Sequence, residues 1–241
     1  MRILVLLLAI ATPVVAWLSQ TGAFGPDQGT ISDRYPTLLV AAGYAFSIWS
    51  LIFALDILHG VLQATGRRRQ DRVLGRIAPA TAAGFFLTAI WMPLFSQELF
   101  WLCVVVIFTA LSCLAWSAWV LSRNRGNFWS WLALSLHAGW LTLAAFLNLA
   151  QTIVAYEVLP TEDMLGWSTV LFVIAGAVLL GLNHARRGNW AYAAAALWGL
   201  VAVYVRQSGS DLPGSSTTAW MAIGIALLLA AQTVWLRMRR A

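Results

Sequence analysis

Three ionisable side chains lie inside long apolar runs, where polar chemistry is costly. Asp56 is the only acidic residue well inside such a run, His59 follows it after three positions, and His137 lies in a later run. A carboxyl group within a membrane span is a candidate functional group, for example in a proton relay or at a ligand. The alternative is a structural pair between Asp56 and either histidine, with the carboxyl protonated. A buried histidine is also a candidate axial ligand to haem, although hydrogen-bonded core histidines are more common.

Aromatic and amide side chains form two stripes at helical spacing. Trp49, Phe53 and Asp56 recur every three or four residues and so share one helix face. The second stripe mixes aromatic, small and polar side chains: His137, Trp140, Ala144, Asn148 and Gln151. A lipid-facing stripe would not carry imidazole and amide groups, because polar groups in hydrocarbon need partners inside the bundle. Both stripes are therefore expected to face the protein interior.

The depths of the two stripes agree. At the helical rise of 1.5 Å per residue, Trp49 lies about 20 Å below Pro36, and Trp140 lies about 24 Å below Tyr156. The two indole rings are therefore expected to face one cavity. Asn148 and Trp91 are expected nearer its outer mouth.

Several reaction classes are excluded by missing residues. All 15 basic residues are arginine, which excludes a lysine Schiff base with retinal or pyridoxal phosphate and a P-loop lysine. No HExxH, GxGxxG or GxSxG motif occurs, so no catalytic group and no metal site is predicted. Cys103 and Cys113 would lie about 15 Å apart on a helix, too far for the approximately 7 Å that a disulfide allows between Cα atoms.

The elements that position these groups are membrane helices. The chain has 241 residues, of which 61% are hydrophobic and 10% charged, whereas a soluble domain is about a quarter charged. A membrane helix needs about 20 apolar residues. Eight runs meet this need, over residues 3–19, 37–65, 78–96, 99–121, 128–156, 164–183, 189–206 and 217–236. The predicted fold is an all-α integral membrane protein with about eight transmembrane helices.

Loop charges predict the orientation. Arginine-rich segments alternate with acidic or neutral ones along the chain, so the positive-inside rule places both termini in the cytoplasm. The net charge of +6 is then a topology signal. A nucleic-acid partner is disfavoured because the arginines sit in short loops. The first run, with Arg2 and Val14-Val15-Ala16, also resembles a signal peptide with its cleavage site. A retained helix is preferred, and cleavage would leave seven helices.

Three aromatic motifs occur in order on the second, third and fifth runs: Trp49-Ser50-Leu51-Ile52-Phe53, Trp91-Met92-Pro93-Leu94-Phe95, and Trp140 with Ala144 and Leu147-Asn148. With the 14 tryptophans, they resemble the tryptophan-rich sensory protein / translocator protein (TspO/MBR) family. The resemblance covers residues 1–156 and implies a five-helix membrane bundle there. Residues 157–241 then form a three-helix C-terminal membrane extension. In it, Ala191, Ala195 and Gly199 recur every four residues and can pack closely on another helix.

The motifs also depart from the family pattern. Ser47, Thr88 and His137 stand where the family usually has proline, asparagine and tyrosine. Asp56 is added on the second helix, while the acidic residue common on the fourth helix is missing. The polarity of the pocket is therefore expected to differ from that of other family members.

The resemblance implies a membrane receptor or sensor that binds hydrophobic ligands in an aromatic pocket within the bundle. The implied ligands are tetrapyrroles, protoporphyrin IX or haem, and no other cofactor is required. The implied ligand-binding residues are Trp49, Phe53, Trp91, Trp140, Ala144, Leu147 and Asn148, with Asp56, His59 and His137 as polar or proton-coupled groups. Location in a bacterial inner membrane is expected, together with a homodimer unless the extra helices cover the dimer face.

Two other functions use the same residues. A secondary transporter of a small or hydrophobic substrate would use the buried Asp56, although no inverted repeat or pair of broken helices supports it. A light-dependent enzyme that degrades a bound porphyrin would use the same pocket. An enzyme is disfavoured because no conventional acid–base or nucleophile constellation is present.

Overall fold

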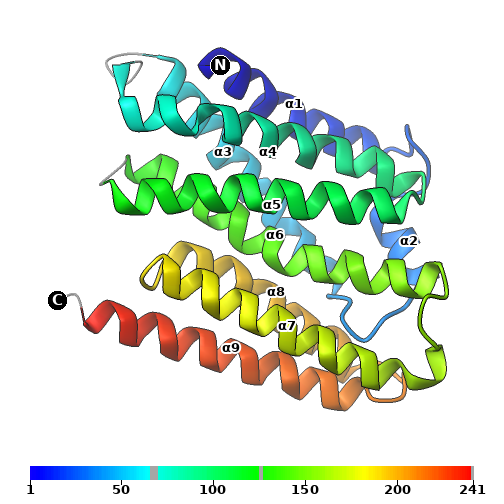
Figure 1. Cartoon of the computed structure of the whole chain (residues 1–241). Coiled ribbons are helices and arrows are strands. Elements are labelled where there is room, and N and C mark those ends of the chain that lie inside the picture. The colour runs from blue at the N-terminus through cyan, green and yellow to red at the C-terminus, as the bar shows by residue number, and fades with distance from the viewer. Residues whose placement is uncertain (66–69, 125–126, 240–241) are drawn as a thin grey trace.

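The computed structural model describes residues 1–65, 70–124 and 127–239, and this part of the chain is helical, without strands (Figure 1). Its α-helices are α1 (Arg2–Gln20), α2 (Gln28–Arg34), α3 (Ile48–Ala64), α4 (Arg72–Ser96), α5 (Phe100–Arg123), α6 (Phe128–Ala155), α7 (Met164–Ala185), α8 (Trp190–Ser208) and α9 (Ser215–Met238). Two short 3-10 helices are η1 (Gly43–Ser47) and η3 (Thr161–Asp163). Five arginines of the predicted charge pattern lie outside the described residues: Arg67, Arg68, Arg69, Arg125 and Arg240.

The chain is an integral membrane protein. Each of the eight predicted runs contains a helix, and seven helical segments of the described residues are long and apolar enough to cross a membrane. The helix of the seventh run, α8, is not among them, so the expected count of eight is not met. Polar Gln207 and the hydroxyl of Tyr192 are buried on α8. A helix whose polar groups are shielded by neighbouring helices needs less apolar surface than one that faces lipid.

Several helix boundaries differ from the sequence expectation. The second run was expected to be helical from residue 37, but α3 begins at Ile48, after η1. The helix of the third run begins six residues early, at Arg72, because the Asp71 carboxylate accepts hydrogen bonds from the first backbone N–H groups of α4. The short α2 was not expected. Asp27 caps it in the same way, through Gly29 and Thr30.

The long helices form two bundles that share α6. Helices α1, α4, α5, α6 and α3 pack in that order as a closed ring, since α3 also contacts α1. On its other side α6 contacts α7 and α8, and α9 packs against both of these. Figure 1 shows α1 and α9 at opposite edges of the molecule and both termini at the same end. The five-helix ring holds the candidate site, and α6 is the wall between the two bundles.

Small residues bring α6 and α8 close together. A methyl group added at Gly139 of α6 would collide with the carbonyl of Tyr192, and one at Gly199 of α8 would collide with Leu143. Ala191 and Ala195 are also buried. The predicted close packing of the stripe at residues 191, 195 and 199 is therefore confirmed, and its partner is α6 of the same chain.

Tryptophans that lie deep in the apolar runs have different environments. Trp140 and Trp91 are buried and Trp49 is half-buried inside the five-helix ring. Trp116 and Trp198, in contrast, are 38% and 40% exposed. Trp116 contacts Arg76 of α4, and Trp198 packs edge-on against Tyr44 of η1, so neither belongs to the buried core of the ring.

Candidate functional site

The walls of the site are aromatic rings from three elements. Trp49 lies in the first turn of α3, where η1 leads the chain into the bundle, and Trp140 lies in the middle of α6. Their ring centroids are 6.0 Å apart with an interplanar angle of 82°. Phe46 of η1 contacts Trp140 in a similar edge geometry, at 6.1 Å. The structure therefore brings the Trp49 and Trp140 rings together, as the sequence predicts, and adds a third ring from the first loop.

Two small adjoining cavities lie between these rings and α4 and α5. The inner cavity reaches Thr88 of α4 and Ala110 of α5. The outer cavity reaches Gln28 and Ser32 of α2. Their free volumes are about 20 Å³ and about 40 Å³, which hold one to a few water molecules each. The walls common to both are Phe46, Trp91, Trp140 and Ala144.

A larger hollow flanks the two cavities. It has a volume of about 320 Å³ between α1, α2 and α3, and it is lined by Trp17 of α1 and Ser50 of α3 among others. Phe46 and Trp49 line both this hollow and the inner cavity. These two side chains are therefore the partition between the hollow and the cavities.

The predicted site residues fall into two groups. Leu147 and Asn148 line the outer cavity, and Ala144 lies one helical turn beyond Trp140, where its small side chain leaves the free space. Phe53 stacks on Trp49 with the ring centroids 5.1 Å apart, but it lines the flanking hollow rather than either cavity. The structure thus places Phe53 behind the cavity wall.

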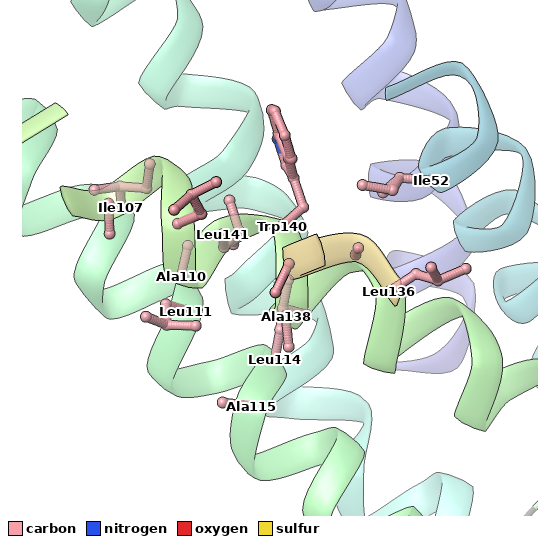
Figure 2. Packing of buried hydrophobic residues seen from close by; sticks show 14 of the residues in the cluster. Ile52, Ile107, Ala110, Leu111, Leu114, Ala115, Leu136, Ala138, Trp140 and Leu141 are labelled. Atoms are coloured by element: carbon pink, nitrogen blue, oxygen red, sulfur yellow. The ribbon is translucent and has the colours of Figure 1, made fainter. Parts of the chain in front are cut away.

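Two indole N–H groups at the cavities differ in their partners. The Trp91 Nε1 group donates a hydrogen bond of 2.8 Å to Asn148 Oδ1. Trp140 is 1% exposed, and no acceptor of the described residues is within hydrogen-bond distance of its Nε1 group. Figure 2 shows the Trp140 ring as part of the buried apolar cluster to which α3, α5 and α6 contribute. A buried donor without a partner costs about 1–3 kcal/mol, which a ligand with a hydrogen-bond acceptor would offset.

The buried acid pairs with the later histidine. Asp56 Oδ2 lies 2.7 Å from His137 Nδ1, and both side chains are buried. On the other side of the ring, His137 Nε2 lies 3.4 Å from the hydroxyl of Thr88, which lines the inner cavity. The pair therefore ties α3 to α6 directly behind the cavity wall. Of the two pairings that the sequence left open for Asp56, the structure contains the one with His137.

His59 does not join this pair. Its Nε2 atom lies 3.2 Å from Gln63 Nε2, one turn farther along α3 and away from the cavities. Its ring contacts Phe85 edge-on. The structure therefore separates His59 from the aromatic cavities, although it shares a helix with Asp56.

The first loop covers the outer cavity as a lid, which we define as residues 21–47. On the α4–α5 side, the hydroxyl of Tyr35 donates a hydrogen bond of 2.8 Å to Glu98, and Arg34 pairs with the same carboxylate. The hydrogen bond to Glu98 raises the pKa of Tyr35. On the α6 side, Gln151 donates to the hydroxyl of Ser32 at 3.0 Å. These contacts close the cavities toward the acidic end of the molecule.

The C-terminal bundle also holds the lid. Gln207 of α8 donates hydrogen bonds of 3.1 Å to the carbonyls of Thr37 and Val40. Trp198 donates to the carbonyl of Ala45 at 3.0 Å. Val40 and Ala45 precede Phe46 in the chain. These hydrogen bonds from α8 therefore hold in place the Phe46 ring, which separates the cavities from the flanking hollow.

Sequence reasoning missed Gln28, Ser32 and Phe46. They lie in the first loop, which lacks a periodic pattern, so no sequence signal marked them as cavity walls. Thr88 was noted only as a departure from the family motif. Its place beside His137 depends on the packing of α4 against α6 across the ring.

A family model for TSPO-like proteins matches residues 2–235 of the chain. The match continues past residue 156 through all three helices of the C-terminal bundle. Comparisons with curated proteins and with solved structures found no match.

Proposed function

The chain belongs to the TSPO-like protein family, and on that premise we propose that it is a membrane sensor for a flat hydrophobic ligand of the tetrapyrrole class. The ligand would bind between Trp49, Trp91 and Trp140. Flat conjugated rings favour offset or edge contacts with indole rings, and these walls offer both orientations. Haem or protoporphyrin IX would be a bound ligand here rather than a catalytic cofactor.

The observation that carries this proposal is the Trp140 Nε1 donor, which is buried at the cavity wall without a partner among the described residues. Polar side chains also line the cavities, Thr88 in the inner one and Asn148 in the outer one, but neither accepts a hydrogen bond from Trp140 Nε1. An acceptor on a ligand in the cavity would supply the missing partner. Tetrapyrroles carry carboxylate side chains that accept hydrogen bonds. A hydrogen bond to a charged acceptor contributes about 1.5–3 kcal/mol.

Binding requires the partition to move. Ligand pockets for drug-sized molecules measure roughly 300–1,000 Å³, whereas the closed cavities measure about 20 and 40 Å³. The flanking hollow, at about 320 Å³, is within the required range. We infer that rotation of Phe46 and Trp49 joins the hollow to the cavities and admits the ligand. The lid contacts to Glu98 and Gln207 then set how readily this opening occurs.

A titration of the purified protein with protoporphyrin IX, followed by the porphyrin absorbance, tests the proposal. Trp140→Phe keeps an aromatic ring in the wall but removes the N–H donor together with part of the indole, so we expect the Kd to rise about ten-fold or more. Trp116→Phe is the matched control, because Trp116 is exposed on the outside of the bundle. An unchanged Kd in both Trp49→Ala and Trp140→Ala would show that protoporphyrin IX does not bind in the aromatic cavities.

Proton-coupled transport is the second candidate function, and the buried Asp56–His137 pair favours it. The pair touches Thr88 at the inner cavity, so a proton on His137 lies one residue away from a bound substrate. Uptake into proteoliposomes that depends on a pH gradient and is lost in Asp56→Asn would support transport. Binding of protoporphyrin IX without any such uptake would support the sensor.

The orientation is also a proposal. The starts of α1 and α4 and the ends of α5, α7 and α9, where described arginines cluster, lie at one end of the molecule (Figure 1). By the positive-inside rule, this end faces the cytoplasm of a bacterial inner membrane. The lid and the acidic loops then face the opposite side. Labelling of single cysteines placed near Asp33 and near Arg237 by an impermeant reagent tests this orientation.

A further inference from the structure

A polar hollow lies at the arginine-rich end of the molecule, at the opposite end from the lid. It has a volume of about 250 Å³ and is lined by Ser122 and Arg123 at the end of α5 and by Ala185, Arg186 and Arg187 at the end of α7. Three arginines from the ends of two helices in different bundles therefore line one hollow. Neither the cavity ligand nor the family motifs use these residues.

Arg186 is the fixed part of this hollow. It is only 4% exposed, and its guanidinium donates hydrogen bonds of 2.8 Å to the carbonyl of Ala115 and 3.3 Å to that of Leu182. The guanidinium carbon also lies 4.7 Å from the centre of the Tyr192 ring. These contacts fix the Arg186 side chain as part of the wall of the hollow. The site is therefore partly organised before any ligand arrives.

The backbone turn beyond Arg186 places the second arginine. Arg187 has φ of +57° and Gly188 has φ of +72°, a region that residues other than glycine rarely adopt. A methyl group at Gly188 would lie 2.9 Å from the carbonyl of Thr233, so α9 packs directly against this turn. The turn leaves the Arg187 side chain exposed beside the buried Arg186.

No acidic side chain of the described residues lines the hollow. The acidic residues lie at the lid end of the molecule, apart from Asp56 inside the bundle and Asp71, whose carboxylate caps α4. The C-termini of α5 and α7 each contribute about half a negative charge. Set against the exposed guanidinium groups of Arg123 and Arg187, this leaves about one positive charge for a bound anion.

Tryptophans place the hollow at the depth of lipid headgroups. The Arg123 guanidinium lies 5.2 Å from the centre of the Trp119 ring, and Trp131 donates a hydrogen bond of 3.0 Å to the hydroxyl of Ser122. Such aromatic side chains gather at the membrane–water interface, where basic pockets between helices bind anionic headgroups. We propose that the exposed Arg123 and Arg187, beside the buried Arg186, bind the phosphate of an anionic phospholipid headgroup.

Native mass spectrometry of the full chain in detergent micelles tests this proposal, with phosphatidylglycerol and phosphatidylcholine as probes. We expect the wild-type protein to prefer phosphatidylglycerol at least about ten-fold. The double variant Arg123→Gln/Arg187→Gln removes two exposed guanidinium groups and should weaken phosphatidylglycerol binding about ten-fold or more. The matched control Arg72→Gln/Arg76→Gln removes the same charge at the same end, on α4, and should leave binding within about two-fold.

Three results would overturn the proposal. Equal binding of the two lipids would remove the anion preference. Equal losses in the two double variants would mean that the arginine-rich end attracts anions without a defined site. Displacement of phosphatidylglycerol by millimolar inorganic phosphate would assign the site to a free phosphate rather than to a lipid. None of these results depends on the ligand of the aromatic cavities, because that binding is measured separately with protoporphyrin IX.

Discussion

Replacing one partner of the Asp56–His137 pair should lower the free energy of unfolding more than replacing both partners. His137→Phe keeps the stacked contact with Phe85, at 5.9 Å, and the edge contact with Trp49, at 5.5 Å. The substitution therefore removes little besides the two ring nitrogens. Asp56 is 2% exposed and would lose its only hydrogen-bond partner of the described residues, since Oδ1 has none. We expect the free energy of unfolding to fall by about 3–5 kcal/mol.

The reverse substitution and the double variant complete a thermodynamic cycle. Asp56→Leu leaves the Nδ1 atom of His137 buried without its 2.7 Å partner, which should cost about 1–3 kcal/mol. The double variant Asp56→Leu/His137→Phe contains neither polar group and fills a similar volume. Such apolar replacements of buried pairs are often neutral or stabilising. The coupling energy of the cycle should therefore be about 3 kcal/mol or more.

The assay is equilibrium unfolding in mixed micelles, followed by the far-ultraviolet circular dichroism of the helices. His184→Phe serves as the control, because His184 is exposed at the end of α7 and its replacement should change stability by less than about 0.5 kcal/mol. If the costs of the two single substitutions simply add in the double variant, the pair does not join α3 to α6 energetically and the reasoning is refuted.

Three further predictions concern packing and the lid. Gly139→Val should destabilise the protein by about 1–3 kcal/mol in the same unfolding assay, because the added side chain meets the α8 backbone. Gly181→Ala should be neutral or stabilising, because no atom lies within 4 Å of the new methyl group. Gln207→Leu removes both hydrogen bonds from α8 to the lid, and faster association of protoporphyrin IX in stopped-flow absorbance is expected; an unchanged rate would show that α8 does not restrain the lid. Hydrogen bonds from Thr30 lower the pKa of Asp27. The cap on α2 should therefore be fully present at a pH above the ordinary carboxyl pKa, and it should be lost as the pH falls through the lowered pKa of Asp27. The protection factor of the Thr30 amide against hydrogen exchange should fall over that acidic range, and a pH-independent protection factor would contradict the cap.

The positions of the long helices could be read from the sequence because about 20 apolar residues are needed to cross a membrane. The ends of the helices were less predictable. Asp71 extends α4 by six residues beyond the apolar run, and the chain before Ile48 bends into η1 rather than continuing α3. Capping and loop contacts decide such ends, and neither changes the apolar periodicity on which the prediction depends.

Part of the candidate site was also predictable. The stripe from His137 to Gln151 had to face the interior, because polar groups need partners there, and this stripe lines the cavities and holds the buried pair. Phe46 could not be found in this way. It becomes a cavity wall only because Trp198 and Gln207 of α8 hold the first loop against the bundle.

The sequence by itself determined that this is a helical membrane protein of the TspO type, with aromatic and polar stripes on the second and fifth helices. Periodicity and hydrophobicity are local properties, so a linear reading suffices for them. Only the tertiary structure decided that Asp56 pairs with His137 rather than His59, that α6 serves both bundles, and that arginines from α5 and α7 meet at one hollow. These features depend on which helix faces pack together. Close approach at Gly139 and Gly199, for example, sets the contact between α6 and α8, and the apolar pattern of a single helix does not contain such a choice.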